Sequence, residues 1–365
     1  MNEQIKEIAD KFQIEGVITS VEEHGDGYIN DTYAVTCERE NGSSIRYILQ
    51  RINHEIFRNP DQLMSNFRKV TDYLKERLME DGRDPERNTL TIVPARDGRD
   101  YVETDGNFYR MVLFIENTIT STVVTNSEDF YRCAKAFGEF QWYLKDFPAQ
   151  ELYETIPDFH NTPARYETFV KAVKENRSNR LHLVEEEVSF INKRMADTYR
   201  LTELLKAGLL PLKVTHNDTK LSNILMDEES GESICVIDLD TIMPGLAAYD
   251  FGDSIRAGGC WSREDETDLD KVFLDLELFE AYTSGFIEGA KDGLSEMEIK
   301  TLPIGAKVIT LEQGIRFLSD YLDGDLYYKI AYPQHNLDRA RTQLKLVADM
   351  EKKWDEMNSI IEKYL

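Results

Sequence analysis

The spacing of apolar residues is strand-like in the first third of the chain and helix-like in most of the rest. Runs rich in Ile, Val, Tyr and Phe, separated by Gly, Asn and Asp, predict strands over residues 16–35 (with one turn), 44–52, 91–94 and 108–115. A helix is expected to start at Asn59-Pro60, because Asn caps helices well and proline suits the first helical position.

From about residue 127 apolar residues recur at helical spacing, and further helices are expected over 164–177, 184–207 and 337–365. A chain of 365 residues usually forms more than one domain. The pattern therefore predicts an α+β protein with two lobes. A small antiparallel-sheet lobe, expected to bind nucleotide, covers residues 1–117 and ends in a hinge at 113–117, and a larger, mainly helical lobe covers 118–365.

The helical pattern is interrupted between residues 224 and 237, where two short apolar runs flank the polar, glycine-containing segment 227–231. We interpret this region as a hairpin that folds back at the Ser230–Gly231 bond. That register places Asn223 opposite Asp238 at one end of the hairpin. A solvent-exposed hairpin with acidic ends is the alternative when either residue is taken alone.

The segment before this hairpin has the spacing of a phosphotransferase catalytic loop, His216-x-Asp218-x-x-x-x-Asn223. In that pattern the Asp accepts the proton of the attacking hydroxyl and the Asn holds a magnesium ion. We therefore predict Asp218 as the catalytic base, with Asn223 and Asp238 as ligands of Mg²⁺. Nearby polar residues are expected to brace the loop rather than to touch substrate: His216, Asp240 and Asp250.

The turn between the first two strands carries a partial glycine loop. Gly25 and Gly27 can let backbone amides approach the phosphates of ATP, and Asn30 and Thr32 can add donors. The complete G-x-G-x-x-G loop of protein kinases is absent, and an ordinary hairpin is the alternative.

Strand 44–52 has no lysine at the point where protein kinases carry one that binds phosphate. Gln50 and Arg51 lie on opposite faces of this strand, so only one of them can face the nucleotide. We assign the contact to Arg51, because a guanidinium can bind two phosphate oxygens at once.

Several motifs resemble one group of kinases, and they are Tyr28–Tyr33, Leu49–Asn53, His216–Lys220, Ile237–Thr241, Tyr249–Asp253 and Gly314–Leu318. They resemble the aminoglycoside-phosphotransferase-like kinases, which have a two-lobed protein-kinase-like fold, and within them the N-acetylhexosamine 1-kinases. The resemblance implies ATP- and magnesium-dependent phosphorylation of the anomeric hydroxyl of N-acetylglucosamine or N-acetylgalactosamine. It also implies that Arg316 and Tyr327, together with Asp218, contact the sugar.

Two other functions stay open at this point. One is a kinase of the same fold for another hydroxyl substrate, such as an aminoglycoside, homoserine or choline. The other is a non-catalytic nucleotide-binding relative, against which the joint presence of Asp218, Asn223 and Asp238 argues. Arg316 lies among apolar residues at helical spacing, so a structural ion pair is the alternative to its sugar contact.

The formal net charge of −25 argues against nucleic acid or an anionic membrane as a partner. Solubility explains this acidity, although an acidic face can also attract a cationic substrate. The four cysteines have no paired spacing, and no apolar stretch predicts a signal peptide or a membrane span. We expect a cytoplasmic enzyme that binds ATP and a small sugar, with no protein partner implied.

Overall fold

The computed structural model describes residues 2–25 and 30–365, and the chain forms two compact units. The first, here called the sheet unit, comprises residues 1–119, 151–156 and 225–242. The second, the helical unit, comprises residues 120–150, 157–224 and 243–365. Residues 151–156 and 225–242 therefore belong to the sheet unit, although they come after the predicted boundary at residue 117.

The main sheet of the sheet unit is antiparallel throughout, with strand order β1-β2-β3-β5-β4. Its strands are β1 (Val17–Glu23), β2 (Asp31–Glu38), β3 (Ser44–Ile52), β4 (Val102–Thr104) and β5 (Asn107–Leu113). A smaller sheet has the order β6-β8-β9, from β6 (Thr118–Ile119), β8 (Ile224–Asp227) and β9 (Ser233–Val236). The helices of this unit are α1 (Asn2–Ala9), α2 (Pro60–Glu80) and α3 (Pro85–Asn88), with a 3-10 turn, η4, at Leu239–Thr241.

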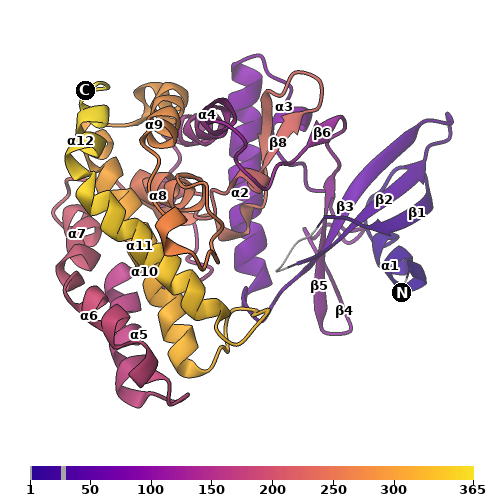
Figure 1. Ribbon diagram of the computed structural model, residues 1–365. Coiled ribbons are helices and arrows are strands. Elements are labelled where there is room, and N and C mark those ends of the chain that lie inside the picture. The colour runs from indigo at the N-terminus through magenta and orange to yellow at the C-terminus, as the bar shows by residue number, and fades with distance from the viewer. Residues whose placement is uncertain (1, 26–29) are drawn as a thin grey trace. The chain divides into compact units, whose positions relative to one another are not determined.

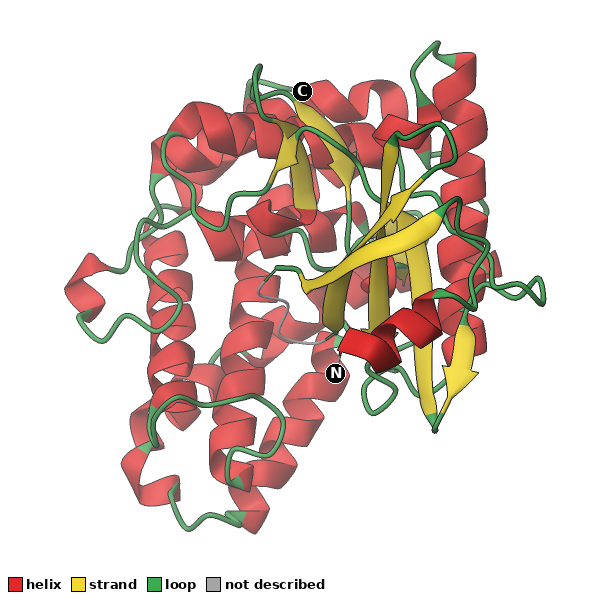
Figure 2. Cartoon of the chain, turned by 90° about the vertical axis from the view of Figure 1, so that its right-hand side faces the viewer, coloured by secondary structure: helices red, strands yellow, loops and turns green. Residues whose placement is uncertain are grey.

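The side chains of the main sheet form rows across neighbouring strands, and each row lies on one of the two faces of the sheet. Tyr47, Leu49 and Tyr109 belong to a hydrophobic core that also contains Ile5 and Ile8 of α1. Figure 2 shows α1, beside the N label, lying over the yellow strands. Side chains of the alternate positions point to the opposite face, because successive residues of a strand alternate in direction.

Helix α2 begins where the sequence predicts. The Asn59 side chain accepts a hydrogen bond from the Gln62 N–H, and Pro60 is the first helical residue. This cap satisfies an N–H group that has no partner inside the helix. The expected apolar face is buried, at Leu63, Phe67, Val70 and Leu74.

Two predictions for strands need correction. Residues 91–94 form only an isolated bridge, Ile92 to Val112, beside β5. The predicted fold-back at Ser230–Gly231 is wrong by one residue, since the Asp227 N–H donates to the Glu232 carbonyl across the loop 228–231. Gly231 ends this loop with φ of 69°, a left-handed conformation that favours glycine.

The helical unit contains the long helices and one short pair of strands, β7 (Lys213–Thr215) and β10 (Met243–Gly245), which are antiparallel. Its helices are α4 (Ser127–Tyr143), α5 (Thr162–Glu175), α6 (Glu185–Asn192), α7 (Met195–Lys206), α8 (Ala247–Gly258), α9 (Leu276–Ala290), α10 (Glu296–Asp323), α11 (His335–Lys352) and α12 (Trp354–Glu362). Its 3-10 turns include η2 (Leu181–Leu183), η3 (Leu221–Asn223), η5 (Leu269–Lys271) and η6 (Lys291–Gly293), and η1 (Ala149–Glu151) ends at its border.

Helix α10 is the centre of the helical unit, and α5, α8 and α11 pack against it (Figure 1). A capping box of Ser295 and Glu298 begins it, and Gly324, with φ of 98°, ends it. Helices α8 and α10 approach closely at Gly252, where an added Cβ would lie 2.5 Å from the Gly305 carbonyl oxygen. This close approach fixes α8, which carries residues that hold the candidate catalytic loop.

Two predicted helices are each split in the structure. The segment 184–207 forms α6 and α7, and the segment 337–365 forms α11 and α12, which are separated by Lys353. Trp354, the first residue of α12, lines a pocket. Within the described residues, no helix combines the length and apolar character that crossing a bilayer requires.

Candidate active site

The predicted catalytic loop, residues 216–223, follows β7 and ends in η3. Asn217 has φ of 66°, so the chain turns sharply just before Asp218. The carboxylate of Asp250 on α8 accepts the N–H groups of His216, at 3.0 Å, and Asn217, at 2.8 Å. The expectation that Asp250 braces this loop is confirmed.

A second carboxylate of α8 holds the other side of the same loop. Asp253 accepts the Thr219 N–H at 2.9 Å and is itself paired with Arg256 at 2.9 Å. The Thr219 hydroxyl donates to the Asp250 carbonyl at 2.6 Å, and the Ser254 hydroxyl donates to the Thr219 carbonyl at 2.6 Å. The N–H and the carbonyl of Thr219 are therefore both hydrogen-bonded to α8. Because Asn217 is held there as well, the backbone on both sides of Asp218 is fixed.

His216 is a buried anchor of the loop, as the sequence analysis expects. Its ring makes edge contacts with Phe137 and Phe140, with centroid distances of 5.5 and 6.0 Å. The Asp218 N–H lies 3.3 Å from His216 Nδ1. His216 is 0% exposed, and these contacts suit a residue that positions its neighbour.

The carboxylate of Asp218 is partly exposed, with 27% of its side chain accessible, and lies between two donors. Lys220 Nζ binds Oδ2 at 2.8 Å, and Asn223 Nδ2 binds the same oxygen at 3.0 Å. Burial acts to raise the pKa of Asp218, but the Lys220 charge and hydrogen bond, with His216 and Asn223, outweigh it and hold the pKa below its usual value. Asp218 is therefore ionised at neutral pH and can accept a proton.

Asn223 has an oxygen suited to a hard metal ion. Its amide nitrogen donates to the Asp218 carbonyl at 2.8 Å and to the Asp218 carboxylate, so Oδ1 is the acceptor atom of the amide. The other predicted ligand, Asp238, lies in the sheet unit with a left-handed backbone, φ 59° and ψ 53°. An amide oxygen and a carboxylate are ligands of the kind that Mg²⁺ takes beside phosphate and water. That the two residues share one ion stays a prediction.

In the sheet unit, a buried polar network crosses the sheet and ends next to Asp238. Arg110 of β5 donates to Gln50 Oε1 at 2.8 and 2.9 Å and forms an ion pair with Asp240. Asn30 donates to the other oxygen of Asp240 at 2.6 Å. The Arg110 and Asp240 side chains are 1% and 3% exposed. Asp240 thus holds the turn after Asp238 to the sheet through Arg110 and Asn30, and not the catalytic loop that it was expected to brace.

Sequence reasoning missed Arg110. The sequence does contain a signal for it. Arg110 is a single cation in the apolar run of β5, and the residues that follow it, 111–114, are all uncharged. A buried cation in such a run requires an anionic partner. Sequence spacing does not show which partner this is, because Asp240 lies 130 positions later, in η4 and outside the main sheet.

Gln50 and Arg51 lie on opposite faces of the sheet, as expected. Arg51 shares its row with Asp31 and Tyr109, and it forms an ion pair with Asp31 at 2.7 Å. Gln50 lies on the face that carries Arg110 and Asp240. The assignment of the phosphate contact to Arg51 therefore stays a prediction, with this residue on the face away from Asp240.

The remaining nucleotide-side predictions fall around the first turn of the sheet. Thr32 accepts a hydrogen bond from Gln50 Nε2 at 3.3 Å, in the same row as Arg110. Gly25 is exposed and has φ of 73°, a conformation that favours glycine. Gly27 lies outside the described residues.

On the acceptor side, Arg316 and Tyr327 belong to the helical unit. Arg316 of α10 donates to Gln313 Oε1 at 3.1 Å and lies against the rings of Phe159 and Tyr328. Tyr327 is 59% exposed, and its ring touches Tyr328 at a centroid distance of 4.8 Å. Tyr328, which sequence reasoning missed, accepts a hydrogen bond from Gln313 Nε2 at 3.2 Å. Among the described residues, Arg316 forms none of the ion pairs that the structural alternative required.

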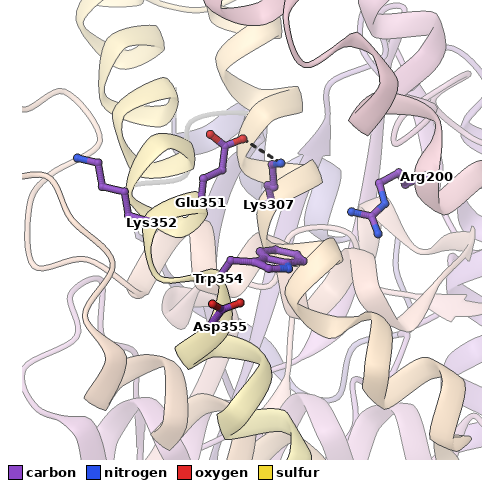
Figure 3. A pocket seen from close by; sticks show the side chains of 6 residues that line it. All are labelled: Arg200, Lys307, Glu351, Lys352, Trp354 and Asp355. Carbon is purple, nitrogen blue, oxygen red and sulfur yellow. Dashed lines mark ion pairs between the residues drawn. The ribbon is translucent and has the colours of Figure 1, made fainter.

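A pocket elsewhere in the helical unit contains none of the predicted site residues (Figure 3). The positive charge of Lys307 in this pocket is balanced by two carboxylates, since Lys307 pairs with Asp197 at 2.8 Å and with Glu351 at 2.9 Å. We assign it no role in catalysis. Its lining is Arg200, Lys307, Glu351, Lys352, Trp354 and Asp355.

Solved structures of small-molecule kinases share this fold. An aminoglycoside phosphotransferase from Alicyclobacillus acidocaldarius is 15% identical, with a TM-score of 0.63, over 98% of this chain and 96% of that one. A choline kinase from Cryptosporidium parvum is also 15% identical, with a TM-score of 0.61, over 98% and 97%. An amicoumacin kinase in complex with AMP-PNP, Ca²⁺ and its substrate is 15% identical, with a TM-score of 0.58, over 94% and 92%.

These solved structures show that the chain has a protein-kinase-like fold. The model of the phosphotransferase enzyme family matches residues 20–284, which include Asp218, Asn223 and Asp238. The chain belongs to this phosphotransferase family.

Proposed function

We propose that the protein transfers the γ-phosphoryl group of ATP to the anomeric hydroxyl of an N-acetylhexosamine, in a magnesium-dependent reaction. The observation that carries the phosphotransfer is the state of Asp218. Its carboxylate is kept ionised by Lys220 and Asn223, on a loop that α8 holds by five hydrogen bonds with Asp250, Asp253 and Ser254. This is the arrangement that a positioned base for a hydroxyl proton requires.

In the proposed reaction, the anomeric oxygen of the sugar forms a bond to the γ-phosphorus as the bond to the bridging oxygen of ATP breaks. Asp218 accepts the proton of that hydroxyl, and ADP leaves. Such a transfer needs positioning and charge neutralisation more than covalent chemistry from the protein. Lys220 keeps Asp218 in place until the proton arrives.

Asn223 and Asp238 would hold Mg²⁺, which when bound would neutralise charge on the β- and γ-phosphates. Their oxygen ligands support this assignment, and a relative of the same fold binds a nucleotide analogue with Ca²⁺. Since Asp240 holds the segment after Asp238 to the face of Gln50, we propose that this face, with Asn30 and Thr32, is the nucleotide side of the sheet. In this proposal Gln50, and not Arg51, faces the phosphates. An ATP-dependent sugar kinase would work in the cytoplasm.

The sugar assignment rests on the resemblance of the motifs and on the surroundings of Arg316 and Tyr327. Among the described residues, the Arg316 guanidinium forms one hydrogen bond, to Gln313, and no ion pair with a carboxylate. It lies against the rings of Phe159 and Tyr328, and the adjacent residue Tyr327 is exposed. Guanidinium and phenol groups next to aromatic faces suit the hydroxyls and ring faces of a sugar.

A panel of acceptors tests the proposal. ADP release should be measured with N-acetylglucosamine, N-acetylgalactosamine, glucose, choline, homoserine and an aminoglycoside under the same ATP and magnesium. The N-acetylhexosamines should have the highest kcat/KM. A higher value for choline or the aminoglycoside would move the assignment to a kinase of those acceptors, which relatives of this fold represent. Absence of turnover with all six would favour a binding protein.

A further inference from the structure

Thr32, Gln50 and Arg110 form one polar row across the main sheet. Gln50 of β3 pairs with Thr32 of β2 on one side and with Arg110 of β5 on the other. Residues directly opposite each other on neighbouring strands have their side chains on the same face. This face is the one on which Arg110 forms its ion pair with Asp240. Three side chains that carry N–H or O–H groups therefore lie side by side within the sheet unit.

The chemistry of arginine fixes the orientation of the Gln50 amide. Two nitrogens of Arg110, Nε and Nη2, donate to Gln50 Oε1 at 2.9 and 2.8 Å. A guanidinium has donors and no acceptor, so the amide atom that faces it must be the oxygen. The amide nitrogen lies on the other side and donates to the Thr32 hydroxyl at 3.3 Å. Turning the amide over would place its NH₂ group against two N–H groups of Arg110.

Two hydrogens of this row have no acceptor among the described residues. The amide nitrogen of Gln50 carries two hydrogens, and one of them is donated to Thr32. The Thr32 hydroxyl accepts that hydrogen bond, which leaves its own hydrogen to be donated. Gln50 and Thr32 are both partly exposed, whereas the Arg110 side chain is 1% exposed. The row therefore ends in a pair of donors that a ligand can reach.

Arg110 itself is out of reach of a ligand. Its Nη1 is paired with Asp240, and its guanidinium carbon lies 4.9 Å from the centroid of the Phe67 ring on α2. Its charge can still act on a ligand through Gln50, because a hydrogen bond to the amide oxygen polarises the amide and strengthens its N–H donors. Strand β3 thus has a donor backed by a buried cation where protein kinases carry a lysine.

The same face of the sheet is apolar one row further along the strands. Ile48 pairs with Ala34 of β2 and with Val112 of β5, two residues from the row of Gln50. Ile48 and Ala34 are partly exposed. Donors beside apolar side chains suit a ligand that combines an anionic group with a flat ring, and a nucleotide has this character.

We propose that the Gln50 amide and the Thr32 hydroxyl donate to phosphate oxygens of ATP, and that Arg110 is the positioning residue that orients this amide. The inference rests on the proposed function, and it names the atoms that take the place of the absent lysine. Ionised phosphate oxygens only accept hydrogen bonds, so they require the nitrogen end of the amide. Arg110 also holds Asp240, and so the same guanidinium fixes the turn that follows Asp238.

Gln50→Glu removes the donors without disturbing Arg110. The carboxylate has the same shape and can still accept both Arg110 hydrogen bonds, but it has no N–H group and repels phosphate. Calorimetry should compare the Kd of ATP and of adenosine at one magnesium concentration. Affinity for ATP should fall by about 10–100-fold, the effect of a hydrogen bond to a charged group. Affinity for adenosine, which has no phosphate, should change by less than about threefold, the effect of one weak contact.

Ser44→Glu is the matched control. It adds the same charge on the same face, at the exposed far end of β3. Both affinities should stay within about threefold of the parent, because physiological salt screens exposed charges beyond about 8 Å.

Arg51→Met tests the opposite face of the strand. Loss of ATP affinity in this variant, with parental ATP affinity in Gln50→Glu, would move the phosphate contact to Arg51 and overturn the inference.

Arg110→Lys tests the positioning role. Lysine keeps the positive charge beside Asp240, but its single nitrogen cannot reproduce the fork that binds Gln50 and Asp240 together. The amide can then turn over, so ATP affinity should fall by about 2–10-fold, the range of one ordinary hydrogen bond. Adenosine affinity should stay at the parental value. Parental ATP affinity in Arg110→Lys would overturn the positioning role.

Melting temperatures without ligand separate binding from folding. Gln50→Glu should melt close to the parent, because both hydrogen bonds from Arg110 are kept. A lowered melting temperature with equal losses of ATP and adenosine affinity would overturn the inference and leave a structural role. A parent that does not bind ATP would reject the proposed phosphotransfer, and the inference with it. A parent that binds ATP but phosphorylates no hexosamine would reject the sugar assignment alone, because the calorimetry contains no acceptor.

Discussion

Arg110 and Asp240 form an ion pair inside the sheet unit in which both side chains are almost fully buried. The pair joins β5 to the 3-10 turn that follows Asp238, and Asn30 and Gln50 satisfy the remaining polar atoms. A buried pair of this kind is weak evidence for net stability, because desolvation offsets its attraction. The pair instead fixes a position: Asp238, the predicted metal ligand, lies two residues before Asp240 and is therefore held close to the sheet.

The first prediction concerns this pair. Arg110→Met leaves the Asp240 carboxylate buried without its cation, which should lower the free energy of unfolding by about 3–5 kcal/mol. Denaturant unfolding measures the loss. The double variant Arg110→Met with Asp240→Leu should regain part of it, because the uncompensated charge is gone. Equal stability of parent and Arg110→Met would contradict the ion pair.

The second prediction concerns the base. Asp218→Asn should lower kcat by about 10²–10⁴-fold, the usual contribution of a positioned proton acceptor. Nucleotide affinity, measured by calorimetry, should change little, because Asp218 acts on the hydroxyl of the acceptor. Retention of most of the turnover would show that another group takes the proton.

The third prediction concerns pH. The pKa of Asp218 is depressed in the folded protein, so activity and the stabilisation from its pair with Lys220 are present at neutral pH. Both are lost as the pH falls below the unfolded value of about 3.9, through the lower folded value. Lys220→Met removes the largest cause of the depression and leaves burial, which raises the pKa. The acid limb of kcat/KM should therefore move to higher pH in this variant, and an unmoved limb would contradict the assignment of Asp218 as the titrating base.

A fourth prediction concerns the metal. Asp238→Ala should weaken nucleotide binding in the presence of magnesium and should change binding in its absence much less, because the carboxylate acts through the ion. Calorimetry with Mg²⁺ and with EDTA provides the comparison. Asp238→Ala with parental affinity for magnesium nucleotide would remove Asp238 from the ligand set.

The sequence was sufficient where function depends on local spacing. The loop from His216 to Asn223 is continuous, and the distances among Asp218, Lys220 and Asn223 follow from the short turn that contains them. The cap of α2 at Asn59 is local in the same way. Strand β3 was also predicted over its whole length, 44–52.

Features that depend on long-range packing could not be predicted. Arg110 meets Asp240 across 130 positions, and the buried Glu312 of α10 pairs with His160, 152 positions earlier. The fold-back of the hairpin at 224–236 was predicted one residue too late, because its loop covers residues 228–231 and ends at the left-handed Gly231. Periodicity also continues through Lys353, so it did not reveal the break between α11 and α12.

The central claim, phosphorylation of the anomeric hydroxyl, is tested most directly by the position of phosphate in the product. N-acetylglucosamine should be incubated with ATP, magnesium and the protein, and the product analysed by phosphorus and proton NMR. The account predicts coupling of the phosphorus to the anomeric proton, and no such product with Asp218→Asn. Phosphate at the C6 hydroxyl, or no sugar phosphate while another acceptor is turned over, would contradict it.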